Sequence, residues 1–113
     1  MKYMLLITWD ERQGLARPEA EQRAELEAHG DFVEALGPRL LEGARLRPSS
    51  EGRRVQVRAG RQVVTDGPFT ETKEALGGYY VIECADEAEA VAWAARCPSA
   101  RHGTVEVRPL WVT

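Results

Sequence analysis

The sequence predicts an α+β fold of the ferredoxin-like type, in which a split β-α-β pattern with an inserted β-hairpin forms an antiparallel sheet. Two observations predict it. Apolar residues recur at helical spacing in two separate segments, and the segments beside them are rich in β-branched and aromatic residues. The order is strand, helix, strand, hairpin, strand, helix, strand without a repeat or linker, so residues 1–113 are expected to form a single domain.

The first half of the chain predicts a strand, a helix and a second strand. Residues 2–8, KYMLLIT, are apolar and β-prone. The helix is expected over residues 17–37, because Pro18 suits a first turn and Gly37 ends the apolar repeat. The second strand is expected at residues 39–46. An inward stripe is expected on the helix from residues at helical spacing, namely Leu26, His29, Val33 and Leu36, with Phe32 beside them.

The second half predicts a hairpin followed by a strand, a helix and a last strand. The alternating segments RRVQVRA and RQVVTD flank Gly60, as in a hairpin. GYYVIEC predicts a strand, and GTVEVRPLWVT predicts the last one. Between them, Asp86 and Glu89 have capping-box spacing at the start of a helix that stops at Pro98. Its inward face is expected to consist of Ala88, Val91, Ala92 and Ala95.

The composition excludes several classes of protein. Hydrophobic residues make up 43% and charged residues 29%, an ordinary globular balance, and the net charge of -3 argues against a nucleic-acid partner. The first apolar run is too short for a signal peptide or a membrane span, so a cytoplasmic protein without membrane contact is expected. Cys84 and Cys97 are expected to be reduced thiols, buried or half-buried. No His or Cys spacing resembles a zinc site, so no metal is expected. No cofactor is expected either.

One face of the predicted sheet is expected to need a partner. Two helices can cover only one face, and strand alternation places apolar side chains together with Glu106 and Arg108 on the other. These two residues either pair with each other across strands or present charge to a small ligand. A second copy of the chain is the simplest cover for the apolar part, which predicts a homodimer.

The segment VVTDGPFTETKEALGGYY, residues 63–80, holds more special residues than a turn needs. Gly67 before Pro68 predicts a sharp bend. Asp66 is either a turn former or a functional carboxylate. The usual turn bond to the backbone two residues on is unavailable, because Pro68 has no N–H, so the carboxylate must reach Phe69 N–H or another donor, or stay free to act.

Turn chemistry alone can explain the second half of that segment. Thr70 or Thr72 can cap a short helical turn, and the chain would leave this turn through the left-handed region at Gly77 and Gly78. Much of the segment therefore has a purely structural interpretation.

Four stretches together resemble the DGPF proteins of the YCII-related family: the run DGPFTETKEALGGYYVIE, the ending GTVEVRP, the opening YMLLI and the helical WAARCP. The resemblance covers essentially the whole chain. It implies a ferredoxin-like subunit that pairs into a dimeric α+β barrel, in a bacterial protein often encoded beside extracytoplasmic-function sigma factors. It implies no established reaction.

The resemblance also suggests two site residues. A His and an Asp are proposed as a catalytic pair in the cleft of YCII-like proteins, and by position these are His29 and Asp66. From the residues alone, His29 is either a core histidine or a proton-transfer group that a nearby carboxylate orients. His102, in the loop PSARHG, is expected to be exposed.

Two functions remain open at this point. The first is a cofactor-independent enzyme or small-molecule binder, in which His29 and Asp66 transfer protons and the ligand is bound by Gly67, Pro68, Phe69 and Arg108. The second is a non-catalytic accessory or regulatory protein that acts with a sigma factor. An enzyme is expected to point Asp66 into an enclosed pocket, whereas a binding protein can use Asp66 in backbone hydrogen bonds.

Overall fold

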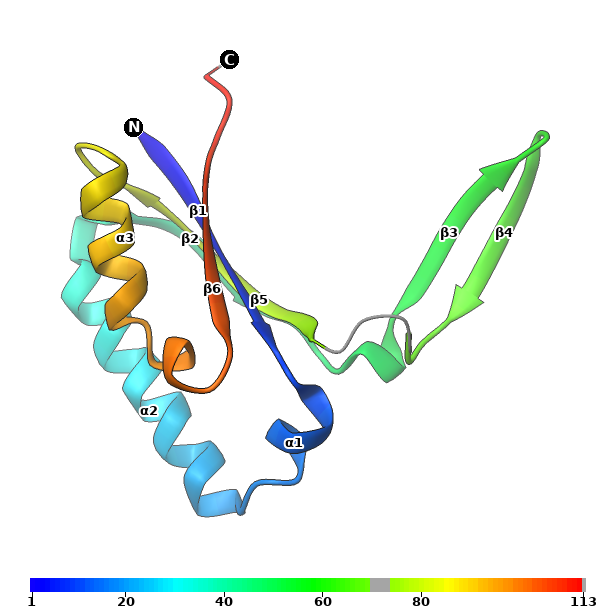
Figure 1. The fold of residues 1–113 in the computed structure, drawn as a ribbon, viewed down its shortest axis with the longest axis horizontal. Helices are drawn as coiled ribbons and strands as arrows, with labels where there is room; N and C mark the ends of the chain where they lie inside the picture. The colour runs from blue at the N-terminus through cyan, green and yellow to red at the C-terminus, as the bar shows by residue number, and fades with distance from the viewer. Residues whose placement is uncertain (70–73, 113) are drawn as a thin grey trace.

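A four-stranded antiparallel sheet forms the centre of the fold (Figure 1). The computed structural model describes residues 1–69 and 74–112. The strand order is β2-β5-β1-β6, so the first and third sheet strands lie together in the middle as in a ferredoxin-like fold. The predicted α+β class and antiparallel sheet are confirmed. The strands are β1 (Lys2–Trp9), β2 (Leu40–Arg45), β5 (Ala75–Glu83) and β6 (Thr104–Pro109).

Two helices, α2 (Glu19–Leu36) and α3 (Glu87–Arg96), cover one face of this sheet (Figure 1). Alternate residues of β1 pack against them, and Leu5 is completely buried together with Leu36 and Ile82. The thiols of Cys84 and Cys97 are free and buried in the same core. No helix in the described ranges is long and apolar enough to cross a membrane.

Four short helical segments join these elements in the described part of the chain, and none of them was predicted as helical. Helix α1 (Glu11–Leu15) directly follows β1, because the Asp10 carboxylate accepts from Gln13 N–H at 3.1 Å and caps it. The 3₁₀ turns are η1 (Gly37–Arg39), η2 (Ser49–Glu51) and η3 (Pro98–Arg101).

The inward face predicted for α3 is wrong. Val91 is 52% exposed, and the three alanines predicted with it, Ala88, Ala92 and Ala95, are exposed as well. The buried residues are Ala90, Trp93 and Ala94, and Cys97 follows at the next helical spacing. The helix turns this way because burying the large Trp93 ring against Phe32 removes more apolar surface from water than burying a row of methyl groups.

The left-handed exit predicted at Gly77 and Gly78 is not found, because both glycines lie inside strand β5. Close packing explains them instead. A Cβ on Gly77 would lie 2.9 Å from Nε1 of Trp9, and one on Gly78 would lie 2.9 Å from the backbone oxygen of Ala44. The proposed caps, Thr70 and Thr72, lie outside the described residues.

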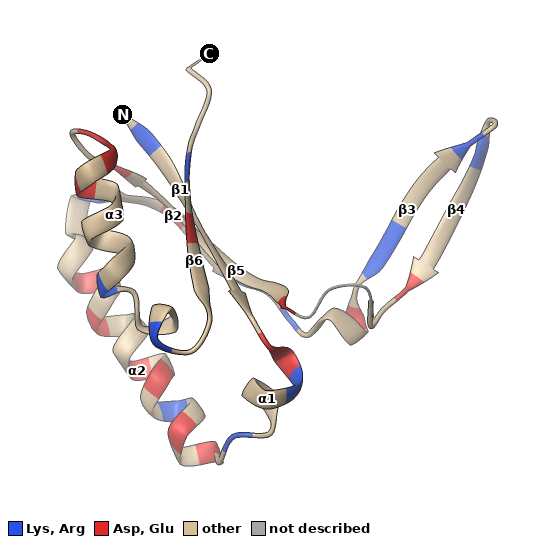
Figure 2. Cartoon of the chain, viewed as in Figure 1, with Lys and Arg blue, Asp and Glu red and all other residues tan. Residues whose placement is uncertain are grey.

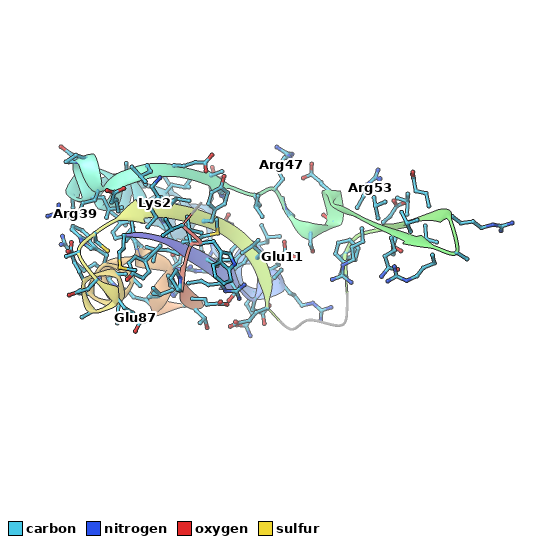
Figure 3. The ribbon with its side chains drawn as sticks, turned by 90° about the horizontal axis from the view of Figure 1, so that it is seen from above. Lys2, Glu11, Arg39, Arg47, Arg53 and Glu87 are labelled. Carbon is cyan, nitrogen blue, oxygen red and sulfur yellow. The ribbon has the colours of Figure 1, made fainter. Side chains whose placement is uncertain are left out.

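The predicted hairpin forms an arm, residues 53–66, that projects away from the sheet (Figure 1). Strands β3 (Arg53–Arg58) and β4 (Arg61–Asp66) pair only with each other. Every residue of both strands is exposed, and Figure 3 shows side chains leaving both faces of the arm. The radius of gyration is 15.9 Å, against about 13 Å for a compact 100-residue domain. The arm is therefore stabilised very little by the rest of its own chain.

The sheet face opposite the helices carries the predicted mixture of apolar and charged residues. Met4 and Leu6 alternate with the core residues of β1, and both are half-buried. Glu106 and Arg108 form an ion pair, although the two residues are neighbours along β6 and not partners across strands. The pair follows from their spacing, since residues two apart in a strand share a face.

Candidate functional site

A cavity of about 300 Å³ lies between helix α2 and the sheet strands β1, β2 and β5. It forms where β2 contributes the small residues Gly43 and Ala44, and β5 contributes its two glycines, so little side-chain volume fills the space under α2. Its walls are mainly apolar and aromatic. The residues that matter for its chemistry are Trp9, Glu25, His29, Arg45, Tyr80 and Ser99.

His29 lies between two hydroxyl groups that come from different parts of the fold. Its Nδ1 is 2.7 Å from the Tyr80 hydroxyl oxygen on β5, and its Nε2 is 2.8 Å from Ser99 Oγ on η3. The Tyr80 ring also stacks on the imidazole, with 6.0 Å between ring centroids. Because these contacts fix both nitrogens, the ring has a defined orientation on the cavity wall.

Both hydroxyls can donate or accept, so either neutral tautomer of His29 is satisfied in this arrangement. Burial is the main cause that lowers the pKa of His29, while the nearby Glu25 carboxylate opposes the shift. Burial likewise raises the pKa of Tyr80 to about 12, so its phenol keeps the proton near neutral pH. At neutral pH the cluster is therefore an uncharged imidazole bonded to two protonated hydroxyls.

Two arginines and one carboxylate line the cavity. Arg17 is already paired, since its guanidinium lies 3.3 Å from Glu25 and 3.4 Å from Glu21. The other arginine, Arg45, forms no hydrogen bond or ion pair through its guanidinium with any described residue. His102 lies beside the Arg17–Glu25 pair, 3.9 Å from the carboxylate, and its side chain is 48% exposed as predicted.

Trp9, which also lines the cavity, has a hydrogen-bond donor that no described residue uses. Its indole Nε1 is buried and has no hydrogen-bond partner among residues 1–69 and 74–112. Gly14 packs on one edge of this indole and Gly77 lies beside the nitrogen. A buried N–H without a hydrogen-bond acceptor lowers stability by about 1–3 kcal/mol. An acceptor oxygen at this nitrogen would therefore be stabilising.

The structure places Asp66 at the base of the arm and not on the cavity. Its carboxylate is 3.1 Å from Nε of Arg53, both side chains are mostly exposed, and Asp66 is not among the residues that line the cavity. Figure 3 shows Arg53 where the arm leaves the body of the molecule. Within one chain, His29 and Asp66 therefore belong to different regions.

The other DGPF residues also build the base of the arm. A Cβ on Gly67 would lie 1.8 Å from the backbone oxygen of Ser49, and Gly67 N–H donates to Gly52 at 3.0 Å. The Arg54 guanidinium stacks 3.9 Å from the centre of the Phe69 ring. Pro68 is exposed beside them. Gly67 is thus required for a close backbone approach.

A carboxylate connects this base to the cavity side of the fold. Glu11 of α1 accepts from Ser49 N–H at 2.7 Å and also from the Ser49 hydroxyl. Arg108, the fourth predicted ligand-binding position, lies on the uncovered sheet face in its pair with Glu106 and does not line the cavity.

Sequence reasoning identified His29 but missed its neighbours. Tyr80 was recognised only as a strand residue, although strand alternation places it on the helix-covered face beside Ile82. Ser99 and Arg45 come from a turn and a strand end, which carry no sequence signal for a site. Among the described residues, no group of three or more His, Cys, Asp or Glu side chains is placed to hold a metal ion.

Comparisons with known proteins agree with this fold. The YCII-related domain matches residues 1–113. A protein of Rhizobium meliloti (strain 1021), described only as uncharacterized, is 45% identical over 83 residues; the match covers 70% of this chain and 64%, less than two thirds, of its relative.

A solved structure of similar fold is that of 5-chloro-2-hydroxyhydroquinone dehydrochlorinase (TftG) from Burkholderia phenoliruptrix AC1100, in complex with 2,5-dihydroxybenzoquinone. Its TM-score is 0.56 at 15% sequence identity, over 98% of this chain and 94% of the other. The likeness therefore concerns the fold, including the ferredoxin-like arrangement of strands and helices. By its match over residues 1–113, the chain belongs to the family of the YCII-related domain.

Proposed function

We propose that this protein binds a small hydroxylated ring compound in the cavity under α2 and transfers protons to and from it through His29. The observation that carries the proposal is the position of His29 on the cavity wall, held between the hydroxyls of Tyr80 and Ser99. An uncharged imidazole in this setting can accept a proton near neutral pH.

The two hydroxyls make His29 suited to proton relay. When its Nδ1 or Nε2 accepts a proton, the hydroxyl on that nitrogen changes from donor to acceptor, so no buried group loses its partner. Tyr80 keeps its proton because burial raises its pKa to about 12. The expected reaction class is therefore the enolisation or tautomerisation of an oxygen-bearing ring, with His29 as the group that takes and returns the proton.

The size and lining of the cavity support a ring as the ligand. A volume of about 300 Å³ with aromatic walls from Trp9 and Tyr80 suits a small planar molecule. The structural neighbour is an enzyme solved with a hydroxylated quinone, which makes this class of ligand a reasonable first choice. Because that likeness concerns the fold, the proposal depends on the cavity itself.

A screen of hydroxylated rings tests this function. Hydroquinone, 4-hydroxybenzamide and 2,5-dihydroxybenzoquinone would be titrated against the wild type, His29→Gln and the matched control His102→Gln. At least one compound should bind the wild type and His102→Gln with the same affinity, and bind His29→Gln about tenfold or more weakly. If no compound binds, or if His29→Gln binds as the wild type does, the cavity is not the proposed site.

A second proposal concerns the arm, because an isolated two-stranded hairpin is only marginally stable in water. Val55, Val57 and Val64 lie on one face of the arm and are between 47% and 63% exposed. We propose that a second copy of the chain covers this face and the uncovered face of the sheet, giving a homodimer. A partner of a different kind, such as a sigma factor, would appear as a persistent monomer in the test below.

Charge supports a second copy as the occupant. The arm carries four arginines and one carboxylate, whereas the whole chain has a net charge of -3, so the body is acidic (Figure 2). The arm of one copy is therefore attracted to the body of another. In this proposal Asp66 and the DGPF turn set the direction of the arm. Free, buried thiols at Cys84 and Cys97 are consistent with action in the cytoplasm.

A further inference from the structure

We infer that the ligand of this cavity is an anion, a planar ring that carries an ionised oxygen such as a carboxylate, and that Arg45 and the indole N–H of Trp9 bind that oxygen. The inference rests on the proposed function, since it concerns the same cavity. It adds the charge of the ligand and the two residues that recognise that charge.

The charges that line the cavity favour an anion. Three ionisable side chains with fixed charge lie on its wall, and two of them, Arg17 and Glu25, neutralise each other at 3.3 Å. Arg45 has no such partner within the described part of the chain. A cation on the wall of a mainly apolar cavity raises the local concentration of anions and binds a carboxylate through paired N–H groups.

The effect of the Arg45 charge on the pKa of His29 indicates that Arg45 lies near this histidine. Burial is the largest cause that lowers the pKa of His29, and the Arg45 guanidinium lowers it further, which places the Arg45 charge within electrostatic range of that ring. A ligand oxyanion beside Arg45 would therefore leave the rest of the ring within the same cavity as His29 and Tyr80.

Trp9 gives the second, independent observation. The indole nitrogen is a donor only, so water or ligand oxygen can satisfy it and a cationic ligand group cannot. It is buried, it lacks an acceptor among the described residues, and its residue lines the cavity. The unpaired donor and the unpaired cation both belong to residues that line this cavity, and both are complementary to an oxygen with negative charge.

The remaining walls favour a ring over a free inorganic anion. Ile7 and Leu26 face the cavity from β1 and α2, and the glycines of β2 and β5 present flat backbone. Such walls offer few hydrogen bonds to a fully hydrated ion and good contact to a planar apolar ring. The ligand class is therefore a small aromatic acid or a ring with an equally acidic enol.

Two probes of nearly the same shape, one charged and one neutral, test whether the cavity recognises the negative charge of its ligand. 4-Hydroxybenzoate and 4-hydroxybenzamide would be titrated against the wild type, Arg45→Met and the control Arg23→Met. The control removes the same charge from an exposed arginine of α2 that does not line the cavity. In the wild type and the control, the benzoate should bind about tenfold or more tightly than the amide. In Arg45→Met this ratio should fall to about one.

The indole signals of the three tryptophans report the second contact in the same titration. The Trp9 signal should shift with the benzoate, whereas Trp93, which donates to Glu89, and the exposed Trp111 should not. A Trp9 signal that stays in place at saturation overturns its role.

Each of the remaining outcomes overturns a stated part of the inference. Equal affinity for both probes in the wild type overturns the anion inference and leaves the proposed function in place. A preference for benzoate that survives in Arg45→Met overturns the assignment of Arg45. If neither probe binds, the anion inference fails, and the ring-binding function fails with it only if hydroquinone and 2,5-dihydroxybenzoquinone do not bind either.

Discussion

The Tyr80 hydroxyl and His29 Nδ1 lie 2.7 Å apart and join strand β5 to helix α2 across the edge of the cavity. The Tyr80 ring also meets Phe32 edge-on, with 5.4 Å between centroids, so the hydroxyl is held by a packed ring and not by a mobile side chain. This relationship orients the proposed proton-transfer group and gives the first prediction.

Replacing Tyr80 by Phe should keep the packing and remove the hydrogen bond. The ring contacts with His29 and Phe32 survive, so the fold is retained, while one nitrogen of a half-buried imidazole loses its partner. We expect the free energy of unfolding to fall by about 1 kcal/mol and ring binding to weaken. Urea unfolding and the same ligand titration measure the two effects.

The control for this change is Tyr3→Phe. Among the described residues, the Tyr3 hydroxyl contacts only the Met1 sulfur, at 3.8 Å, so its removal should leave ligand binding unchanged. Wild-type stability and affinity in Tyr80→Phe would show that the hydroxyl neither stabilises nor orients His29.

Stability should depend on pH through His29. Burial lowers the pKa of this histidine in the folded chain, and unfolding restores its ordinary value. Between the two values the unfolded chain binds more protons, so the contribution to stability is present above about pH 6.5 and is lost as the pH falls towards the folded pKa. Denaturant unfolding at several pH values should show this loss in the wild type.

Two histidine variants separate the contribution of His29 from the other causes of the loss of stability at low pH. In His29→Gln the stability should fall less between about pH 7.5 and pH 5.5 than in the wild type. His102→Gln, which removes the exposed histidine, should follow the wild type. A His29→Gln profile parallel to that of the wild type would contradict a buried, uncharged His29.

Substituting Gly67 in the DGPF turn should lower the stability of the arm clearly, whereas substituting Asp66 should change it little. In Gly67→Ala the new methyl group collides with the backbone oxygen of Ser49, so we expect a loss of about 1–3 kcal/mol in the stability of the arm. In Asp66→Asn an exposed ion pair with Arg53 is lost, at a cost of about 0–1 kcal/mol.

Hydrogen exchange of the backbone amides of the arm, with the amides of β1 as the reference, measures the stability of the arm in both variants. Ring binding should be unaffected in Asp66→Asn, because the carboxylate does not line the cavity. A large loss of binding in that variant, with the arm intact, would return Asp66 to the role of a catalytic partner, supplied by a second copy.

The homodimer should dissociate when charge is placed on the apolar face of the arm. Light scattering should give twice the chain mass for the wild type. Val57→Lys adds charge to an already basic arm and should weaken the dimer about tenfold or more. Val91→Lys on α3 is the matched control, since Val91 is 52% exposed and Val57 63%. A wild-type monomer at micromolar concentration would contradict the proposed dimer.

The order of strands and helices could be predicted because strong local patterns mark each element. The alternation around Gly60 identified the hairpin, and Asp86 with Glu89 identified the start of α3, where Asp86 accepts from Glu89 N–H at 2.9 Å. The rotation of α3 could not be predicted in the same way. Both its faces are rich in alanine, and only packing against Phe32 decides that Trp93 turns inward.

The candidate site was harder to predict because its residues are brought together by tertiary structure. His29 was visible on the helix stripe, but Tyr80 and Ser99 are separated from it by 51 and 70 residues. The DGPF run drew attention to Asp66, yet its glycine is explained by a close approach to Ser49. A dense group of special residues in the sequence can thus mark a structural junction as readily as a site.

Proton transfer at a ring-binding cavity is tested most directly by the ring nitrogens of His29. Long-range proton–nitrogen NMR spectra would be recorded while 2,5-dihydroxybenzoquinone is added to the wild-type protein, with His102 as the internal control. We predict that the His29 signals shift to saturation with one ligand per chain and that the apparent pKa of His29 changes in the complex, while His102 stays constant. His29 signals that keep their positions and their titration curve at saturating ligand would contradict the proposed site.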